Sequence, residues 1–252
     1  MSNLLAIETS GRFGSVAIAN HKIDSLDSIV SLDLPRTVGS AQSLAQGISR
    51  IAQENQIALA NFGCIALVNG PGSFTGLRVG IATAKSMAYA LGIPVVGLDT
   101  LDVIHLQAAS SPKVLDPIYS IGHTHAMLDA YRGQIFVKSK DKIGRFSESK
   151  VADLADFLSW CRDVEPDPTA HAMVGPGVER VRRFLERELD EGDLRDWGAR
   201  VSWFGEQEFE PHAKFVAKLG LQRWDRGGQI DPIALLPSYF RGSAAEEKAK
   251  AV

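Results

Sequence analysis

The sequence has few cysteines, no excess of positive charge and no uninterrupted apolar segment of membrane-spanning length. Two cysteines, Cys64 and Cys161, predict buried, reduced thiols rather than a disulfide framework. A formal net charge of -3 gives no general attraction for nucleic acid, so such a contact would need a local patch or a second subunit. The most apolar segment, residues 79–98, is interrupted by Lys85, Gly92 and Pro94.

The remaining composition is that of an ordinary globular protein. Hydrophobic residues make up 45% and charged residues 23%, and 252 residues suit one large or two smaller domains. No basic region precedes Glu8, so we expect no signal peptide. Together these features favour a cytoplasmic protein without a membrane partner.

Short apolar runs separated by glycine-containing turns predict an α/β protein. The first half predicts three hairpin strands followed by helix, strand, helix and strand: residues 4–7, 14–19, 29–34, 40–55, 64–68, 77–91 and 95–98. A strand that ends in a carboxylate, followed by a glycine turn and a returning strand, occurs at Glu8 and again at Asp129. This weak internal repeat predicts two related domains rather than one large sheet.

A glycine-rich loop, Gly70-Pro-Gly-Ser-Phe-Thr-Gly76, connects the predicted strand at residues 64–68 to the next helix. It fails the spacing of a P-loop, because no Gly-Lys-Ser/Thr follows at the required distance. It also lacks the third glycine of a dinucleotide fingerprint, and the glycines that flank the serine of a hydrolase nucleophile elbow. Two interpretations stay open: nucleotide binding by another geometry, or a tight connection whose glycines let strand, loop and helix pack closely.

Two predicted helices have outer faces with little charge. The helix at residues 77–91 carries only Arg78 and Lys85, and a helix that is apolar nearly all round must be covered nearly all round. The helix at residues 40–55 has a neutral face opposite its apolar stripe. These faces indicate protein–protein association.

Four fragments of the chain resemble the TsaB (YeaZ) family of the actin-like ATPase (ASKHA) superfamily, which is related to the TsaD, or glycoprotease, family. They are Leu4-Leu-Ala-Ile-Glu-Thr-Ser10, Gly70-Pro-Gly-Ser-Phe-Thr-Gly-Leu-Arg-Val-Gly-Ile-Ala-Thr-Ala-Lys85, Leu128-Asp-Ala-Tyr-Arg-Gly-Gln-Ile-Phe136 and Leu236-Pro-Ser-Tyr-Phe-Arg241. The second fragment is highly specific. The resemblance implies two actin-like (ribonuclease H-like) domains, each a mixed sheet flanked by helices. We expect them at residues 1–103 and 104–243, with the last helix able to pack back on the first domain and a frayed tail at 244–252.

The resemblance further implies a non-catalytic partner of TsaD in the formation of threonylcarbamoyladenosine, next to the anticodon of tRNAs that read codons beginning with A. A TsaE-family ATPase engages that pair, tRNA is reached through the complex, and the isolated chain can form a homodimer. In this family the heterodimer forms through the helices that correspond to residues 40–55 and 77–91. The interface candidates on these helices are Leu44, Ile48, Leu77, Val79, Gly80, Thr83, Ala84 and Met87.

The same resemblance argues against catalysis. TsaD-like chains carry two metal-binding histidines spaced i, i+4, and Thr100 and Ile104 stand at those positions here. A side chain without a donor atom and a neutral hydroxyl are poor substitutes for imidazole. We therefore expect no catalytic residues, no metal and no required cofactor. An independent ATPase or a glycoprotease-like hydrolase is the alternative.

Two groups of residues keep a ligand interpretation open. Proteins of the actin-like superfamily carry carboxylates near the nucleotide and metal at strand ends, and Glu8 and Asp129 stand at such ends here. Two interpretations fit these residues: weak binding of ATP or ADP, or simple capping of a turn. The candidates for the nucleotide are Glu8, Thr9, Ser10, Gly70, Gly72 and Asp129. His123 and His125 point the same way if they lie on a strand, but two ligands form only half a zinc site.

Overall fold

The computed structural model describes residues 3–20, 25–35, 40–112, 114, 121–163, 170–188, 201–205, 209–238 and 240. The chain divides into two compact units, Met1–Gln107 with Glu210–Pro237, and Ala108–Phe209 with Ser238–Val252. The division differs from the boundary expected at residue 103. Residues 210–237 belong to the first unit because the helix that they contain packs on the first sheet.

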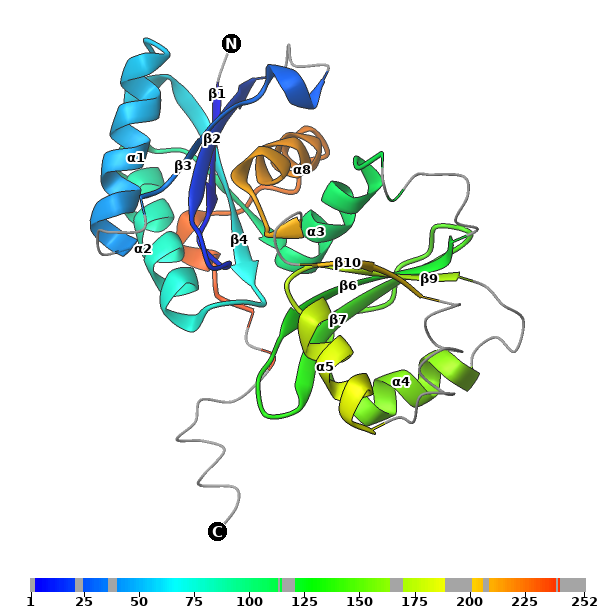
Figure 1. Cartoon of the computed structure of the whole chain (residues 1–252). Coiled ribbons are helices and arrows are strands. Elements are labelled where there is room, and N and C mark those ends of the chain that lie inside the picture. The colour runs from blue at the N-terminus through cyan, green and yellow to red at the C-terminus, as the bar shows by residue number, and fades with distance from the viewer. Residues whose placement is uncertain are drawn as a thin grey trace. The chain divides into compact units, whose positions relative to one another are not determined.

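The first unit is a five-stranded mixed sheet with helices on both faces. The sheet has the order β3-β2-β1-β4-β5, in which β1 pairs antiparallel to β2 and parallel to β4. Figure 1 shows α1 and α2 on one face of this sheet and α8 on the other. The elements are β1 (Asn3–Glu8), β2 (Ser15–Asn20), β3 (Val30–Asp33), α1 (Ser40–Glu54), β4 (Phe62–Gly70), α2 (Phe74–Leu91), β5 (Val95–Asp99), α3 (Thr100–Ala109) and α8 (Ala213–Asp225), with short 3-10 turns at Leu26–Ser28, Leu59–Asn61 and Pro232–Ala234.

The alternation of side chains along β1 divides the first unit into two cores. Leu5 and Ile7 belong to the cluster that includes the buried faces of α1 and α2. Leu4 and Ala6 belong to the cluster that includes α8. Small residues let α8 approach closely, since a Cβ at Gly220 would overlap the side chain of Ala66.

The second unit repeats this plan. Its sheet has the order β10-β9-β6-β7-β8; β6 pairs antiparallel to β7 and parallel to β9, as β1 does with β2 and β4. One core cluster joins one face of this sheet to α4 and α5. The elements are β6 (Ile121–Asp129), β7 (Gln134–Asp141), β8 (Lys150–Asp153), α4 (Leu154–Asp163), β9 (Ala170–Val174), α5 (Val178–Glu188) and β10 (Val201–Phe204). The predicted α/β class, with two mixed sheets flanked by helices, is confirmed.

The structure adds three elements that the sequence did not predict, α3, β8 and β10. It also starts α2 at Phe74 rather than Leu77, because the side chain of Ser73 caps the helix by accepting a hydrogen bond from the amide of Gly76. The tail expected at 244–252 lies outside the described residues. Within the described part of the chain, no helix has both the length and the apolarity to cross a membrane.

Candidate functional site

Glu8 ends β1 inside the first unit and is fully buried. Its Oε1 accepts hydrogen bonds from the amide of Ser10 at 2.6 Å, the hydroxyl of Ser10 at 2.6 Å and the amide of Gly11 at 3.1 Å. Its Oε2 has no hydrogen-bond partner among the described residues. Burial raises the pKa of Glu8 to about 7, against the lowering effect of those three hydrogen bonds and with a further raising contribution from the charge of Glu210. The carboxyl group therefore stabilises a turn and is half protonated near neutral pH.

The glycine-rich loop packs directly against the turn that follows Glu8. A Cβ at Gly76 would overlap the carbonyl oxygen of Thr9, and a Cβ at Gly80 would overlap the hydroxyl of Thr9. At Gly72, where φ is 154°, a Cβ would lie 2.6 Å from that of Ser10. This geometry requires glycine because backbone meets backbone there.

Two of the first amides of α2 are used inside the chain. The amide of Ser73 donates to the carbonyl of Ser10 at 2.8 Å, and that of Gly76 donates to the hydroxyl of Ser73 at 3.2 Å. A phosphate at a helix N-terminus is held by amides of this kind when they are free. The junction thus brings Glu8, Thr9 and Ser10 together with Gly72, and it does so as a packed connection between β1, β4 and α2.

Asp129 occupies the corresponding strand end in the second unit. It ends β6, as Glu8 ends β1, and its Oδ1 accepts a hydrogen bond from the amide of Tyr131 at 2.7 Å. Tyr131 and Arg132 both have positive φ, at 59° and 53°, and Gly133 follows at 79°. A carboxylate that binds the amide two residues later stabilises such a turn.

The burial of α1 and α2 corrects the set of interface candidates. Five of the eight candidate residues are buried inside the first unit rather than exposed on its surface: Leu44, Ile48, Leu77, Gly80 and Ala84. Ser43 of α1 is also buried. The sequence misplaced these residues because a helix that is apolar all round does not reveal which face meets its own sheet.

The surface that α2 presents is made of other residues. Val79, Thr83 and Met87 are half-buried, and both Val79 and Met87 pack against the first core cluster. We name Val79, Ala82, Thr83, Ser86 and Tyr89 the α2 outer face. Ala82 and Ser86 are exposed, and the side chain of Tyr89 is 76% exposed. These five residues are uncharged, and the exposed Arg78 borders them one turn before Ala82.

The two charged residues of α2 have roles inside the first unit. The Nζ of Lys85 donates hydrogen bonds to the carbonyls of Ile233 at 3.0 Å and Leu235 at 3.1 Å. The guanidinium of Arg78 lies over the ring of Phe74, 3.8 Å from its centroid. Lys85 therefore connects the segment after α8 to α2 through these two hydrogen bonds.

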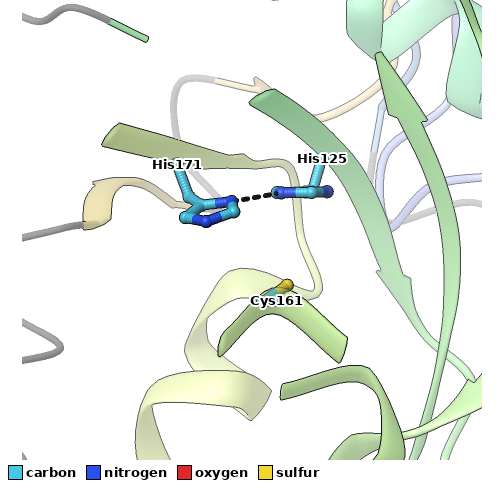
Figure 2. A group of neighbouring side chains, drawn as sticks. All are labelled: His125, Cys161 and His171. Atoms are coloured by element: carbon cyan, nitrogen blue, oxygen red, sulfur yellow. Dashed lines mark hydrogen bonds between the residues drawn. The ribbon is translucent and has the colours of Figure 1, made fainter. Parts of the chain in front are cut away.

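The second unit contains a histidine–cysteine cluster that the sequence only half revealed. Figure 2 shows His125 and His171 side by side, with the sulfur of Cys161 directed toward them from α4. The three residues offer ligand atoms that all lie within 4.8 Å of one another, and all three are buried. His123 is adjacent, with its ring stacked 5.5 Å from that of His171. The spacing of His123 and His125 gave a signal, whereas Cys161 and His171 join only through the tertiary fold.

Comparison with known proteins gives consistent matches. Residues 39–160 match the family profile described as TsaD: tRNA N6-adenosine threonylcarbamoyltransferase. The chain is 24% identical over 249 residues to the tRNA threonylcarbamoyladenosine biosynthesis protein TsaB of Bacillus subtilis, covering 97% of this chain and 96% of that protein. It is 30% identical over 176 residues to an uncharacterised protein of Mycobacterium tuberculosis, covering 69% of this chain and 72% of that one. The solved structure of YeaZ from Pseudomonas aeruginosa matches with a TM-score of 0.70 and 25% identity, over 95% of this chain and all of that chain.

Proposed function

Since the chain belongs to the TsaB (YeaZ) family, we propose that it is a non-catalytic partner of a TsaD-family protein in the formation of threonylcarbamoyladenosine on tRNA. The modified adenosine lies next to the anticodon of tRNAs that read codons beginning with A. The observation that carries this proposal is the likeness to the Bacillus subtilis TsaB protein along nearly the whole chain. A TsaE-family ATPase engages the pair, and tRNA is reached through the complex.

The α2 outer face supports a docking role. It combines half-buried Val79 and Thr83 with exposed Ala82, Ser86 and Tyr89, and its one charged neighbour on this side of α2 is the exposed Arg78, at its edge. Small side chains at the centre of such a face let another helix approach closely, and an exposed tyrosine is typical of interface anchors. The occupant that we propose is a TsaD-family protein, and a second copy of this chain uses the same face when the partner is absent.

Two features of the first unit support a role without chemistry of its own. The packed β4–α2 junction uses the amides of Ser73 and Gly76 within the chain, as described above. Thr100 and Ile104, which stand where TsaD-like chains carry metal-binding histidines, are both fully buried in this unit. Neither residue offers a usable metal ligand at the surface.

Reconstitution of the modification tests the proposal. A TsaC-type synthase, TsaD and TsaE from the same source are incubated with tRNA, with and without this chain, and threonylcarbamoyladenosine is measured by mass spectrometry. We expect modification to depend on the added chain. Equal modification without it would contradict the accessory role, and ATP or peptide turnover by the isolated chain that Glu8→Ala abolishes would favour the enzymatic alternative.

Matched variants locate the docking surface. Ala82→Arg and Ser86→Arg place a large charged side chain on the α2 outer face, and Ala60→Arg adds the same group at an exposed position on the 3-10 turn before β4. Calorimetry with purified TsaD should show weaker binding for the first two variants and unchanged binding for the third. Ala84→Arg is unsuitable for this purpose, because Ala84 is fully buried and the variant would disrupt the core. Unchanged affinity in both α2 variants would place the interface elsewhere.

A further inference from the structure

We propose that His125, Cys161 and His171 form a site for one transition-metal ion of the zinc type in the second unit. Nothing in the tRNA-modification role requires such a site, so the proposal is independent of that role. It concerns residues of one compact unit only.

The fold brings the three residues together from three elements. β6 and β9 are neighbouring parallel strands, with His123 opposite His171 and His125 opposite Met173 in the register. His125 and His171 therefore present their imidazoles on one face of the sheet, and α4 covers this face through Phe157 and Cys161. Because strands and a helix rather than loops hold the donors, their positions are fixed by the core.

The donor set suits a borderline-soft cation. Two imidazoles and one thiolate are ligands that zinc and its neighbours in the transition series prefer, and three protein ligands leave one position for water or another donor. The Nε2 of His125 lies 2.9 Å from the Nδ1 of His171. Two nitrogens bound to one tetrahedral zinc ion are about 3.3 Å apart, given Zn–N bonds of about 2.0–2.1 Å. A shift of a few tenths of an ångström would bring these nitrogens to that spacing.

A supporting hydrogen bond is already in place. The Nδ1 of His125 lies 2.8 Å from the Oγ of Ser139 on the adjacent strand β7. When this nitrogen carries the proton and donates it to Ser139, the lone pair of Nε2 points toward His171 and Cys161. Metal-binding histidines in proteins usually fix their second nitrogen in this way.

A hydrogen-bond chain alone explains less of the cluster. Ser139, His125 and His171 satisfy one another, but the Nδ1 of His123 is buried with no hydrogen-bond partner among the described residues. Buried polar groups of this kind are uncommon and call for an explanation. A cation bound by His125, Cys161 and His171 would give these three donors a common partner. It would lie beside His123 without binding the Nδ1 of that residue.

The charge balance of binding is simple. The divalent ion displaces the proton of the Cys161 thiol, which leaves to solvent, and a metal–sulfur bond forms; no oxidant or reductant is involved. The two imidazoles bind in their neutral form. Burial raises the pKa of the Cys161 thiol to about 12, and the charge of Lys150 opposes this by favouring the thiolate.

Cobalt(II) substitution provides the test, because a cobalt–thiolate bond has a charge-transfer band in the near ultraviolet. The full chain is freed of metal with a chelator, dialysed, and titrated with Co²⁺ and then Zn²⁺. We expect one Co²⁺ per chain, a charge-transfer band, and displacement by one equivalent of Zn²⁺. Substoichiometric binding without this band would overturn the proposal.

The two cysteines provide a matched pair of variants. Cys161→Ala should lose the charge-transfer band, whereas Cys64→Ala, which alters the buried cysteine of the first unit, should retain it. Ser139→Ala should weaken Co²⁺ binding about 10- to 100-fold while keeping the band, because it removes only the supporting hydrogen bond. A band that persists in Cys161→Ala would refute the assignment.

Tryptophan fluorescence provides a second test in which both cysteines are intact, so its result does not depend on the cysteine variants folding correctly. The ring of Trp160 lies 5.9 Å from that of His125, and bound Co²⁺ should quench its fluorescence. The quenched emission should be missing in Trp160→Phe, whose ligands are intact. Quenching of equal size in this variant and in the unaltered chain would mean that the ion binds away from the cluster.

Discussion

Replacing Glu8 by glutamine should remove a pH dependence from the stability of the first unit. The glutamine keeps an oxygen that can accept the hydrogen bonds from Ser10 and Gly11, so the turn after β1 should be preserved. What the substitution removes is the ionisation of a carboxyl group that is fully buried.

The magnitude follows from the pKa of Glu8, which burial raises to about 7 from an ordinary value of 4.5. Because the folded state holds this proton more tightly than the unfolded chain, its stability falls as the pH rises from 4.5 to 7 and then levels off. Between pH 5 and pH 8 the loss amounts to about 2–3 kcal/mol, since each pKa unit corresponds to about 1.4 kcal/mol. Glu8→Gln should lack this decline, whatever constant effect its amide nitrogen adds.

Hydrogen exchange of the β1 and β4 amides measures this stability for the first unit alone, after correction for the pH dependence of the intrinsic exchange rates. The unaltered chain and Glu8→Gln should diverge steadily from pH 5 to pH 7. Glu54→Gln, at an exposed position on α1, controls for the loss of one negative charge. Parallel pH profiles for the unaltered chain and Glu8→Gln would refute the reasoning, because they would mean that Glu8 ionises in the folded state as it does in the unfolded one.

Two further predictions concern packing in the same unit. Gly76→Ala should destabilise it by about 3 kcal/mol or more, because the added Cβ would overlap the carbonyl of Thr9. Gly205→Ala in the second unit is the control: no atom of the described residues lies within 4 Å of its added Cβ, so thermal unfolding should change little. Leu44→Ala should lower the free energy of unfolding by about 2–5 kcal/mol, because Leu44 is a fully buried core residue, whereas the exposed Gln46→Ala should change it little in a urea titration. A Leu44→Ala chain of unchanged stability would contradict its placement in the core.

Periodicity was sufficient to predict most strands and helices of the first unit. Residues 4–7 and 95–98 are short apolar runs bounded by turn residues, and the structure has β1 and β5 there. The run at residues 4–7 cannot show, however, that its alternate side chains serve two different cores. That information depends on which helices cover each face, and α8 comes from a segment more than 200 residues away.

The same limit explains why several interface candidates chosen from the sequence are buried in the structure. In α2, Leu77 and Ala84 are as apolar as Val79 and Ala82, so composition gives no reason to place one pair inside and the other outside. Contact with the first sheet decides the matter. Lys85 did carry a signal, but its partners are the backbone carbonyls of Ile233 and Leu235, which are about 150 positions away and have no side-chain signature.

One signal of the internal repeat could have been found in the sequence. Gly70-Pro71-Gly72 begins at the last residue of β4 and is separated from α2 by Ser73, and Gly175-Pro176-Gly177 connects β9 directly to α5. In the second copy, a Cβ at Gly177 would lie 2.9 Å from the backbone of Leu128, next to the strand end at Asp129. The glycine-rich loop is therefore a recurring way to pack a helix start against the first strand of each unit, which favours the packing interpretation over a nucleotide-specific one.

The two units use one topology for different purposes. In the first, the glycines of α2 fit closely around Thr9, which fixes the helix on the sheet and leaves its outer face uncharged and accessible. In the second, the corresponding first strand β6 carries His123 and His125 on the face that meets α4, whereas the side chains of β1 that pack with α1 and α2 are those of Leu5 and Ile7. A sheet face needs no imidazoles to be stable, and burying them lowers stability unless each finds a partner. Their presence on one sheet and not on the other therefore argues for a ligand in the second unit, while the rigid, uncharged helix surface argues for a protein partner on the first.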